Sequence, residues 1–172
     1  MGNITHPLPV KLICGIIANN ERLFLEVEKI LSKKFGPIDV KSQIFDFNFT
    51  DYYEKEMGWP LHRRFTSFRE LVSPADLAEI KLRTNDVEKN CRVKGKRRIN
   101  IDPGYVAMER LVLATGKNYT HRIYLSRGIY ADLTLVFQRG SFRPLEWTYR
   151  DYADQEVIGF FNDVRERYKN QL

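Results

Sequence analysis

Short polar side chains recur in stretches of this chain where apolar residues alternate with a period of two. Residues 96–105 read KRRINIDPGY. A strand there places Ile99 and Ile101 on one face and Arg98, Asn100 and Asp102 on the other. Similar alternation over residues 44–50 and 121–137 adds further side chains to the polar face: Asp46, Asn48, Arg122, Tyr124, Tyr130, Asp132 and Thr134. Aspartate and asparagine are depleted from strands, and residues that violate local propensity are expected at functional sites.

Two kinds of chemistry fit this polar face. Asp46, Asp102 and Asp132 could hold Mg²⁺, which takes oxygen ligands and keeps waters that a phosphate can replace. Arg98 and Arg122 could bind the phosphate itself in a bidentate manner. If the three carboxylates met without a cation, repulsion should raise the pKa of one of them. The complete predicted ligand-binding set is Asp46, Asn48, Arg98, Asn100, Asp102, Tyr105, Arg122, Tyr124 and Tyr130. The alternative is an ordinary solvated sheet face, with opposite charges paired across strands.

A second candidate is the basic segment 92–98, which reads RVKGKRR. At the end of a helix these cations would complement the helix dipole, and they could equally hold a nucleic-acid backbone. The sequence lacks the aromatic signature of the common RNA-recognition module. It also lacks a phosphate-binding loop and a nucleophile elbow, so no motif in it fixes a reaction.

Composition favours an anionic partner. The formal net charge is +6 and the sequence pI is about 9.3, which suits a nucleotide, another phosphorylated small molecule or RNA. Cys14 and Cys91 lie far apart without a CxxC neighbour, which favours a reducing compartment. The chain shows neither a signal peptide nor an apolar run long enough to span a bilayer. We therefore expect a cytoplasmic protein with no membrane partner.

Periodicity and turn residues predict the order of the elements. Strands are expected at 10–18, 40–50, 63–71 and 98–102, and helices at 21–35, 73–91 and 154–169. Asp102-Pro103-Gly104-Tyr105 has the composition of a type II turn and should close the fourth strand. Residues 106–114 are compatible with helix or strand, and 121–125, 129–137 and 142–149 should form a meander.

This order predicts an α+β fold. The first six elements match a ferredoxin-like βαββαβ core in a two-layer sandwich, which the antiparallel meander and a C-terminal helix extend. The length of 172 residues suits a single domain over 1–172, with residues 1–9 as a flexible lead-in. If helices cover only one side of the sheet, the polar side chains face solvent or a ligand.

Several short segments resemble an uncharacterised bacterial family, DUF4416, that is defined by a domain of unknown function. They are Phe49-Thr50-Asp51-Tyr52-Tyr53, Glu56-Met57-Gly58, Ala78-Glu79-Ile80-Lys81-Leu82, Asn100-Ile101-Asp102-Pro103-Gly104-Tyr105, Arg122-Ile123-Tyr124-Leu125 and Gly128-Ile129-Tyr130. The resemblance covers nearly the whole chain. Members are sometimes labelled GTP-binding protein, but the resemblance implies no established reaction.

Three functions remain open from the sequence. The first is binding of a nucleotide or other phosphorylated ligand on the polar face. The second is a metal-assisted phosphate-transfer or hydrolytic enzyme with Mg²⁺ as cofactor, and the third is an RNA- or protein-binding module. The mixture of aspartate, arginine and tyrosine fits the first best.

Overall fold

The computed structural model describes residues 2–49 and 51–172, and leaves the side chains of Asp51 and Glu54 undescribed. Met1 and Thr50, the predicted ends of the lead-in and of the second strand, lie outside the described residues. The elements in chain order are β1 (Val10–Ala18), α1 (Glu21–Phe35), β2 (Ile38–Lys41), β3 (Phe45–Asp46), η1 (Asp51–Tyr53), α2 (Glu54–Met57), β4 (His62–Val72), η2 (Pro74–Asp76), α3 (Leu77–Asn90), β5 (Ile99–Val106), β6 (Arg110–Thr115), β7 (Arg122–Ser126), β8 (Ile129–Gln138), β9 (Ser141–Pro144) and α4 (Gln155–Lys169).

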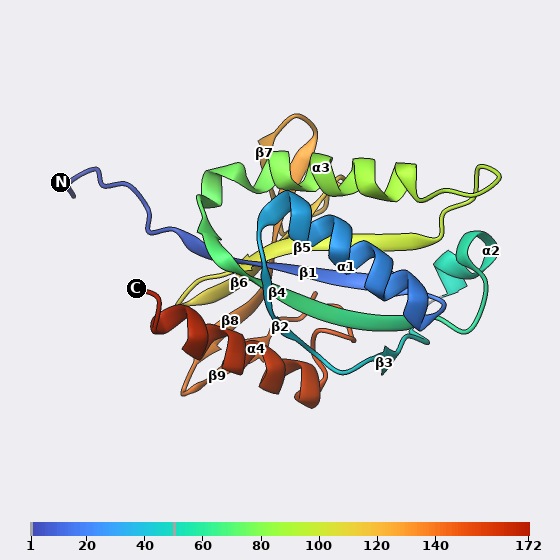
Figure 1. Ribbon diagram of the computed structural model, residues 1–172. Helices are drawn as coiled ribbons and strands as arrows, with labels where there is room; N and C mark the ends of the chain where they lie inside the picture. The colour runs from blue at the N-terminus through green and yellow to red at the C-terminus, as the bar shows by residue number, and fades with distance from the viewer. Residues whose placement is uncertain (1, 50) are drawn as a thin grey trace.

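The strands form one antiparallel sheet in the order β2-β4-β1-β5-β6-β8-β7, with β3 beside β4 and β9 beside β8. β1 lies inside the sheet between β4 and β5 and is buried along its whole length, as its continuous apolar sequence predicts. The α+β class is confirmed. Figure 1 shows the long strands crossing the middle of the molecule, with α1 in front of them and α3 above.

Helices α1 and α3 cover the first face of the sheet. The apolar stripe of α1 packs on Leu12, Cys14 and Ile16 of β1, and the same core contains Ile99 and Ile101 of β5. The Asn20 side chain caps α1 by accepting a hydrogen bond from the Leu23 backbone N–H. These contacts confirm which face of β5 is apolar.

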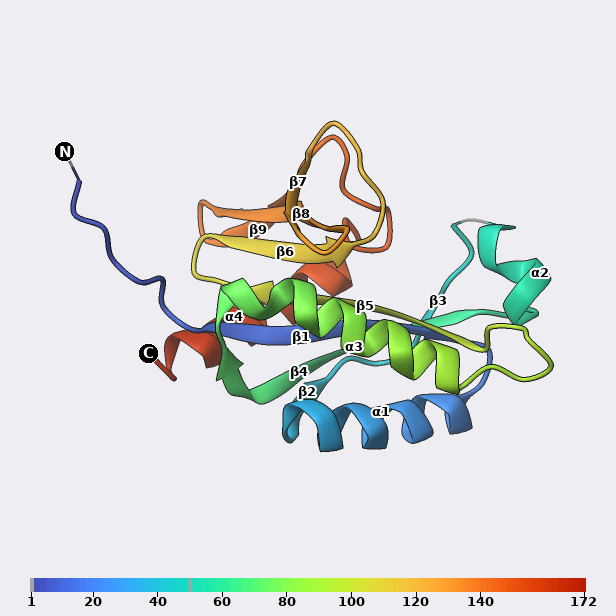
Figure 2. The ribbon, with the colours of Figure 1, turned by 90° about the horizontal axis from the view of Figure 1, so that it is seen from above.

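The opposite face is not open along its whole length, which corrects the two-layer prediction. Val157, Phe161 and Val164 of α4 pack against residues from both halves of the sheet, including Ile13 and Leu135. The sheet curves around this helix, and Figure 2 shows β6, β8 and β9 folded to one side of β1 and β4. One cavity on this face lies near the N-terminus of α4.

Pro103 and Gly104 do not form the predicted turn. β5 continues through both and pairs with β1 along its length, but it pairs with β6 only over residues 104–106. Proline has no N–H to donate to a ladder, and the β6 pairing ends next to Pro103. A β-carbon on Gly104 would overlap the carbonyl oxygen of Val112, so glycine permits the close approach of β6. Beyond this point β5 and β6 separate.

Other predictions differ from the structure in extent. The expected strand at 40–50 is split into β2 and β3, and Phe49 is exposed instead of facing the core. Residues 106–114 contain the end of β5, a turn and β6. The last meander strand stops at Pro144, and residues 145–154 return over the sheet as a loop. Among the described residues, no helix is long and apolar enough to cross a membrane.

Candidate functional site

The separation of β5 from β6 creates a cavity of about 270 Å³ on the face opposite α1 and α3. Its walls come from β4, β5, β6, β8, the segment before α2 and the 145–154 loop. The lining residues are Phe47, Tyr52, Tyr53, Arg63, Asp102, Leu113, Ala114, Thr115, Lys117, Asp132, Tyr149, Asp151 and Tyr152. The lining therefore combines aromatic rings, three carboxylates and two cations.

Arg63 on β4 is the buried cation of the cavity. One guanidinium nitrogen contacts Asp102 Oδ2 at 2.8 Å and another contacts Asp151 Oδ2 at 2.7 Å. Its charge also lies over the rings of Phe47, at 5.2 Å, and Tyr152, at 5.5 Å. Since its side chain is only 5% exposed, the two carboxylates are needed to balance its charge.

Asp102 is held in its ionised form. Burial by itself would raise the pKa of this carboxyl group, but the charges of Arg63 and Lys81 and a hydrogen bond from Arg63 lower the pKa below its ordinary value. Asn100 donates a further hydrogen bond to Asp102 Oδ1 at 3.0 Å. The pKa of Asp102 is therefore lowered, because a guanidinium group adjoins it.

Tyr152 contributes the one tyrosine hydroxyl that is buried without a hydrogen-bond partner among the described residues. Its ring is fixed by stacking on Phe161 at 5.8 Å and by an edge contact with Phe65 at 5.1 Å. Burial raises the pKa of Tyr152 well above its ordinary value, so the hydroxyl stays protonated and can donate. A β-carbon at Gly15 would lie 2.8 Å from this hydroxyl, so glycine at the centre of β1 leaves space beneath the site. A buried hydroxyl without a partner costs roughly 1–3 kcal/mol, which an acceptor on a ligand would recover.

Asp132 forms the wall on the β8 side. Its Oδ2 accepts a hydrogen bond from Arg122 Nε at 2.8 Å and lies 3.2 Å from His121 Nε2. Arg122 also donates to the Tyr149 hydroxyl at 2.6 Å and to the Lys117 backbone carbonyl at 3.0 Å. All three guanidinium nitrogens of Arg122 are therefore occupied within the protein.

Lys117 lies at the rim of the cavity and is exposed. Its ammonium group is 4.6 Å from the centre of the Tyr52 ring. No carboxylate of the described residues pairs with it, whereas Arg63 is bound by two. An ammonium at the rim is thus the cation available to an incoming anion.

The structure brings together only part of the predicted ligand set. Asp102 and Asp132 line the cavity, Asn100 positions Asp102, and Arg122 positions Asp132. The remaining predicted residues lie elsewhere: Asp46, Asn48, Arg98, Tyr105, Tyr124 and Tyr130.

Asn48 is exposed in the segment after β3, and the other five outlying residues make their contacts away from the cavity. Asp46 is exposed on β3 and pairs with His62 at 3.2 Å. Arg98 precedes β5, and its charge acts on Cys91 on the helical side of the sheet. Tyr105 packs with the start of α3, while Tyr124 makes an edge contact with Tyr130 at 5.4 Å.

The three predicted metal ligands are not brought together, since Asp46 lies apart from Asp102 and Asp132. Within residues 2–49 and 51–172, no group of three or more histidine, cysteine, aspartate or glutamate residues is placed to hold a metal ion. Asp151 takes the place expected for Asp46 at the cavity, but both Asp102 and Asp151 face the guanidinium of Arg63.

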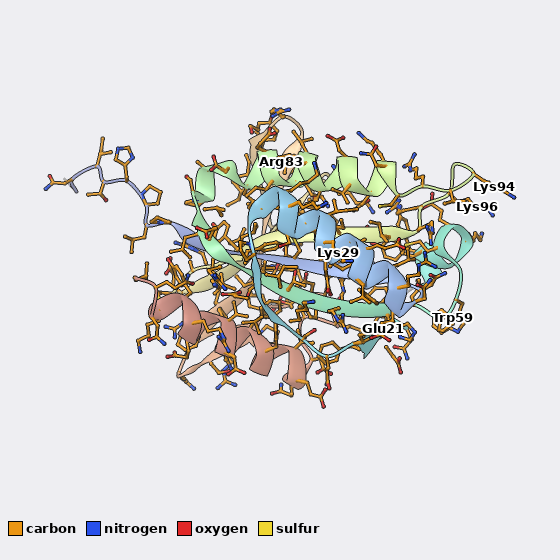
Figure 3. The ribbon with its side chains drawn as sticks, in the orientation of Figure 1. Glu21, Lys29, Trp59, Arg83, Lys94 and Lys96 are labelled. Carbon is orange, nitrogen blue, oxygen red and sulfur yellow. The ribbon has the colours of Figure 1, made fainter. Side chains whose placement is uncertain are left out.

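The basic segment 92–98 forms a projecting turn after α3. Val93 and Lys96 pair, and Lys94 and Gly95 adopt positive φ angles of 50° and 76° between them. Arg97 turns back to Glu56 at 3.1 Å, which places this basic turn beside α2. Figure 3 shows Lys94 and Lys96 at the tip, at the same end of the molecule as Trp59.

The sequence prediction missed Arg63, Asp151, Tyr149 and Tyr152. The sequence patterns place Arg63 in a strand but not on the polar face, Tyr149 at the end of the third meander strand and Tyr152 in no element. A charge in an otherwise apolar strand was the available signal for Arg63, because such a charge needs buried partners. No local pattern indicates that the 145–154 loop returns over the sheet.

Comparison with known proteins identifies the family. A family model described as a domain of unknown function, DUF4416, matches residues 8–168. The chain belongs to this family. No curated protein and no solved structure matches the chain. The matched region contains every residue of the cavity, so the site lies within the part of the chain that defines the family.

Proposed function

We propose that the cavity binds a nucleotide, with the base inside and the phosphate at the rim. The observation that carries this proposal is the combination of tyrosine rings with carboxylate acceptors inside and Lys117 outside. Aromatic rings stack on the flat face of a base, and carboxylates accept hydrogen bonds from its amino and ring N–H groups. The Tyr152 hydroxyl supplies the matching donor.

The charges decide which part of the ligand enters. Three carboxylates line the interior, and the guanidinium of Arg63 already pairs with two of them. A phosphate group would be repelled there, whereas a neutral base would not. The volume of about 270 Å³ lies at the lower end of the roughly 300–1,000 Å³ of small-molecule sites, which suits a base with part of its sugar. Lys117 then contacts the phosphate from the rim.

Thermal unfolding of the protein with nucleosides, nucleotides and sugar phosphates tests this proposal. A nucleotide at about 100 times its Kd adds roughly 2.7 kcal/mol of stability. At roughly 2–4 °C per kcal/mol, the melting temperature of a chain of this size should rise by about 5–10 °C. In the Lys117→Gln variant, the nucleotide should raise the melting temperature only as much as the nucleoside does. Lys29→Gln, on the exposed face of α1 in Figure 3, is the matched control.

A second pair of variants separates the base from the phosphate. Tyr149→Ala should weaken binding of nucleoside and nucleotide alike by about 1–3 kcal/mol, the usual loss of one aromatic–base stack. Tyr124→Ala removes a similarly exposed tyrosine outside the cavity and should leave both affinities unchanged. The proposal would be rejected if sugar phosphates raised the melting temperature as much as nucleotides do, or if no nucleotide raised it.

We also infer that β1, β2, β4 and β5 with α1 and α3 form a ferredoxin-like unit. What supports this is the strand order β2-β4-β1-β5 together with helical connections after β1 and β4. In this interpretation, β6–β9 and α4 are the addition that encloses the cavity. Determining an experimental structure and comparing its first 106 residues with ferredoxin-like domains would test the inference.

A further inference from the structure

Three aromatic side chains lie together beside the cavity, and two of them, Tyr119 and Trp147, are exposed, whereas the His121 side chain is only 10% exposed. The rings of His121 and Trp147 lie parallel, with centres 4.8 Å apart and an interplanar angle of 11°. Tyr119 meets His121 edge-on at 5.6 Å. Tyr119 is 66% exposed and Trp147 is 39% exposed. We call Tyr119, His121 and Trp147 the aromatic stack.

Two members of the aromatic stack, Trp147 and His121, are anchored by polar contacts at the cavity wall. Trp147 Nε1 donates to the Leu133 carbonyl at 2.7 Å, and His121 lies 3.2 Å from the Asp132 carboxylate that lines the cavity. Arg122 lies between the two surfaces, 6.0 Å from the Tyr119 ring and 2.6 Å from the Tyr149 hydroxyl. Rings fixed in this way lose little conformational entropy when a partner stacks on them.

A single large apolar side chain on a protein surface is common, but a group of them often marks a site of interaction. The exposed rings of the aromatic stack form such a group. None of the three rings belongs to a hydrophobic core cluster of the described residues. Arg122, the cation over the Tyr119 ring, is already paired with Asp132, whereas Lys117 and Arg150 are exposed and have no carboxylate partner among the described residues. Glu146 is the one acidic residue in the loop segment 145–150.

We propose that the natural ligand of the cavity is a single-stranded nucleic acid, with one base in the cavity and the next on the aromatic stack. This inference rests on the proposed function and narrows its ligand class. Successive bases stack on successive aromatic side chains in proteins that bind single strands, while cations follow the backbone. Lys117 lies at the cavity rim and precedes Tyr119 by two residues, Arg150 follows Trp147 by three, and the net charge of +6 favours a polyanion.

Binding of labelled oligonucleotides tests the proposal. A hexanucleotide should bind at least tenfold more tightly than the mononucleotide of the same base. Tyr119→Ala should remove about tenfold of the hexanucleotide affinity and leave mononucleotide affinity unchanged. Tyr119 is mostly exposed, so this variant should fold normally. Trp59→Ala removes an indole that is 57% exposed at the α2 end and is the matched control.

Fluorescence supplies a readout that a merely structural role would not change. The chain has two tryptophans, so Trp59→Phe leaves Trp147 as the only one. Its emission should be quenched by the hexanucleotide and not by the mononucleotide. RNA and DNA hexamers show which sugar is preferred, and tighter binding of either supports the proposal.

The possible failures are distinguishable. If mononucleotides do not bind, the proposed function fails. If mononucleotides bind and the hexanucleotide gains nothing, or if Tyr119→Ala weakens both equally, only this inference fails. If a hexaglutamate peptide bound as tightly as the hexanucleotide, the attraction would be one of net charge alone, and this inference would also be overturned.

Discussion

Arg63 joins three parts of the chain at one side chain. It projects from β4, contacts Asp102 on β5 and Asp151 in the 145–154 loop, and lies over the ring of Tyr152. A charge that is almost wholly removed from water is stable only with such partners. Arg63 therefore fixes the loop over the sheet and sets the acidic lining of the cavity at the same time.

Removing one of its carboxylate partners should be costly. Asp102→Asn should lower the free energy of unfolding by about 3 kcal/mol at pH 7, because the buried guanidinium keeps only Asp151. Asp46→Asn is the control, since that carboxylate is 87% exposed and surface changes usually stay within about 0.5 kcal/mol. Urea unfolding of both variants measures the difference.

The same pair predicts a pH dependence with a definite sign. Burial opposes ionisation of Asp102, but Arg63 lowers its pKa in the folded protein below the unfolded value of about 3.9. The ionised carboxylate therefore stabilises the fold above about pH 4, and this contribution is lost as the pH falls through the folded pKa. The stability difference between wild type and Asp102→Asn should shrink between pH 5 and pH 3. An unchanged difference would argue against the ion pair.

At the scale of single elements, β5 carries the decisive departure from the predicted structure. Pro103-Gly104 has the composition of a turn, and local propensity alone favours that interpretation. Tertiary pairing with β1 overrides it, since residues 99–106 all have partners on that strand. The proline then serves to end the ladder with β6, which no local pattern reveals.

Two glycine variants test this account of β5. Gly104→Ala should destabilise the protein by about 1–3 kcal/mol, because the new methyl group meets the Val112 carbonyl and forces β6 away. Gly116→Ala has open space and no positive φ, so its stability should stay within about 1 kcal/mol of wild type. Thermal unfolding compares the two. If the Gly104→Ala and Gly116→Ala variants were equally stable, β6 could not approach β5 as closely as the structure shows.

Across the whole molecule, sequence patterns predicted most elements because period and capping are local. The strand at 10–18, the helix at 21–35 and the apolar alternation of β5 all appear where expected. The site was predicted only in part, because Asp102 and Asp132 are identifiable by strand position, whereas Asp151 and Tyr152 reach the cavity through a loop. The covering of the second face by α4 also depends on long-range packing, which periodicity does not specify.

The basic turn at residues 92–98 adds to the electrostatic field of the whole protein, through which an anionic strand would be attracted. Lys94 and Lys96 are exposed, and neither has an acidic partner among the described residues. Lys94→Gln combined with Lys96→Gln should reduce the slope of log affinity against log salt by about 1.4 for a single strand, at about 0.7 per phosphate. Binding isotherms at several salt concentrations give the slope. An unaltered slope would mean that the turn is only solvated.

The pairing between β5 and β6 is short, and this affects how the protein unfolds in part. Three residue pairs join the half of the sheet built from β1, β2, β4 and β5 to the half built from β6–β9, and α4 and α3 bridge the two by side-chain packing. Backbone continuity across the molecule is therefore weakest beside the cavity. The two halves are natural units of partial unfolding, and amide hydrogen exchange should show β6–β9 losing protection as a group before β1 and β4 do.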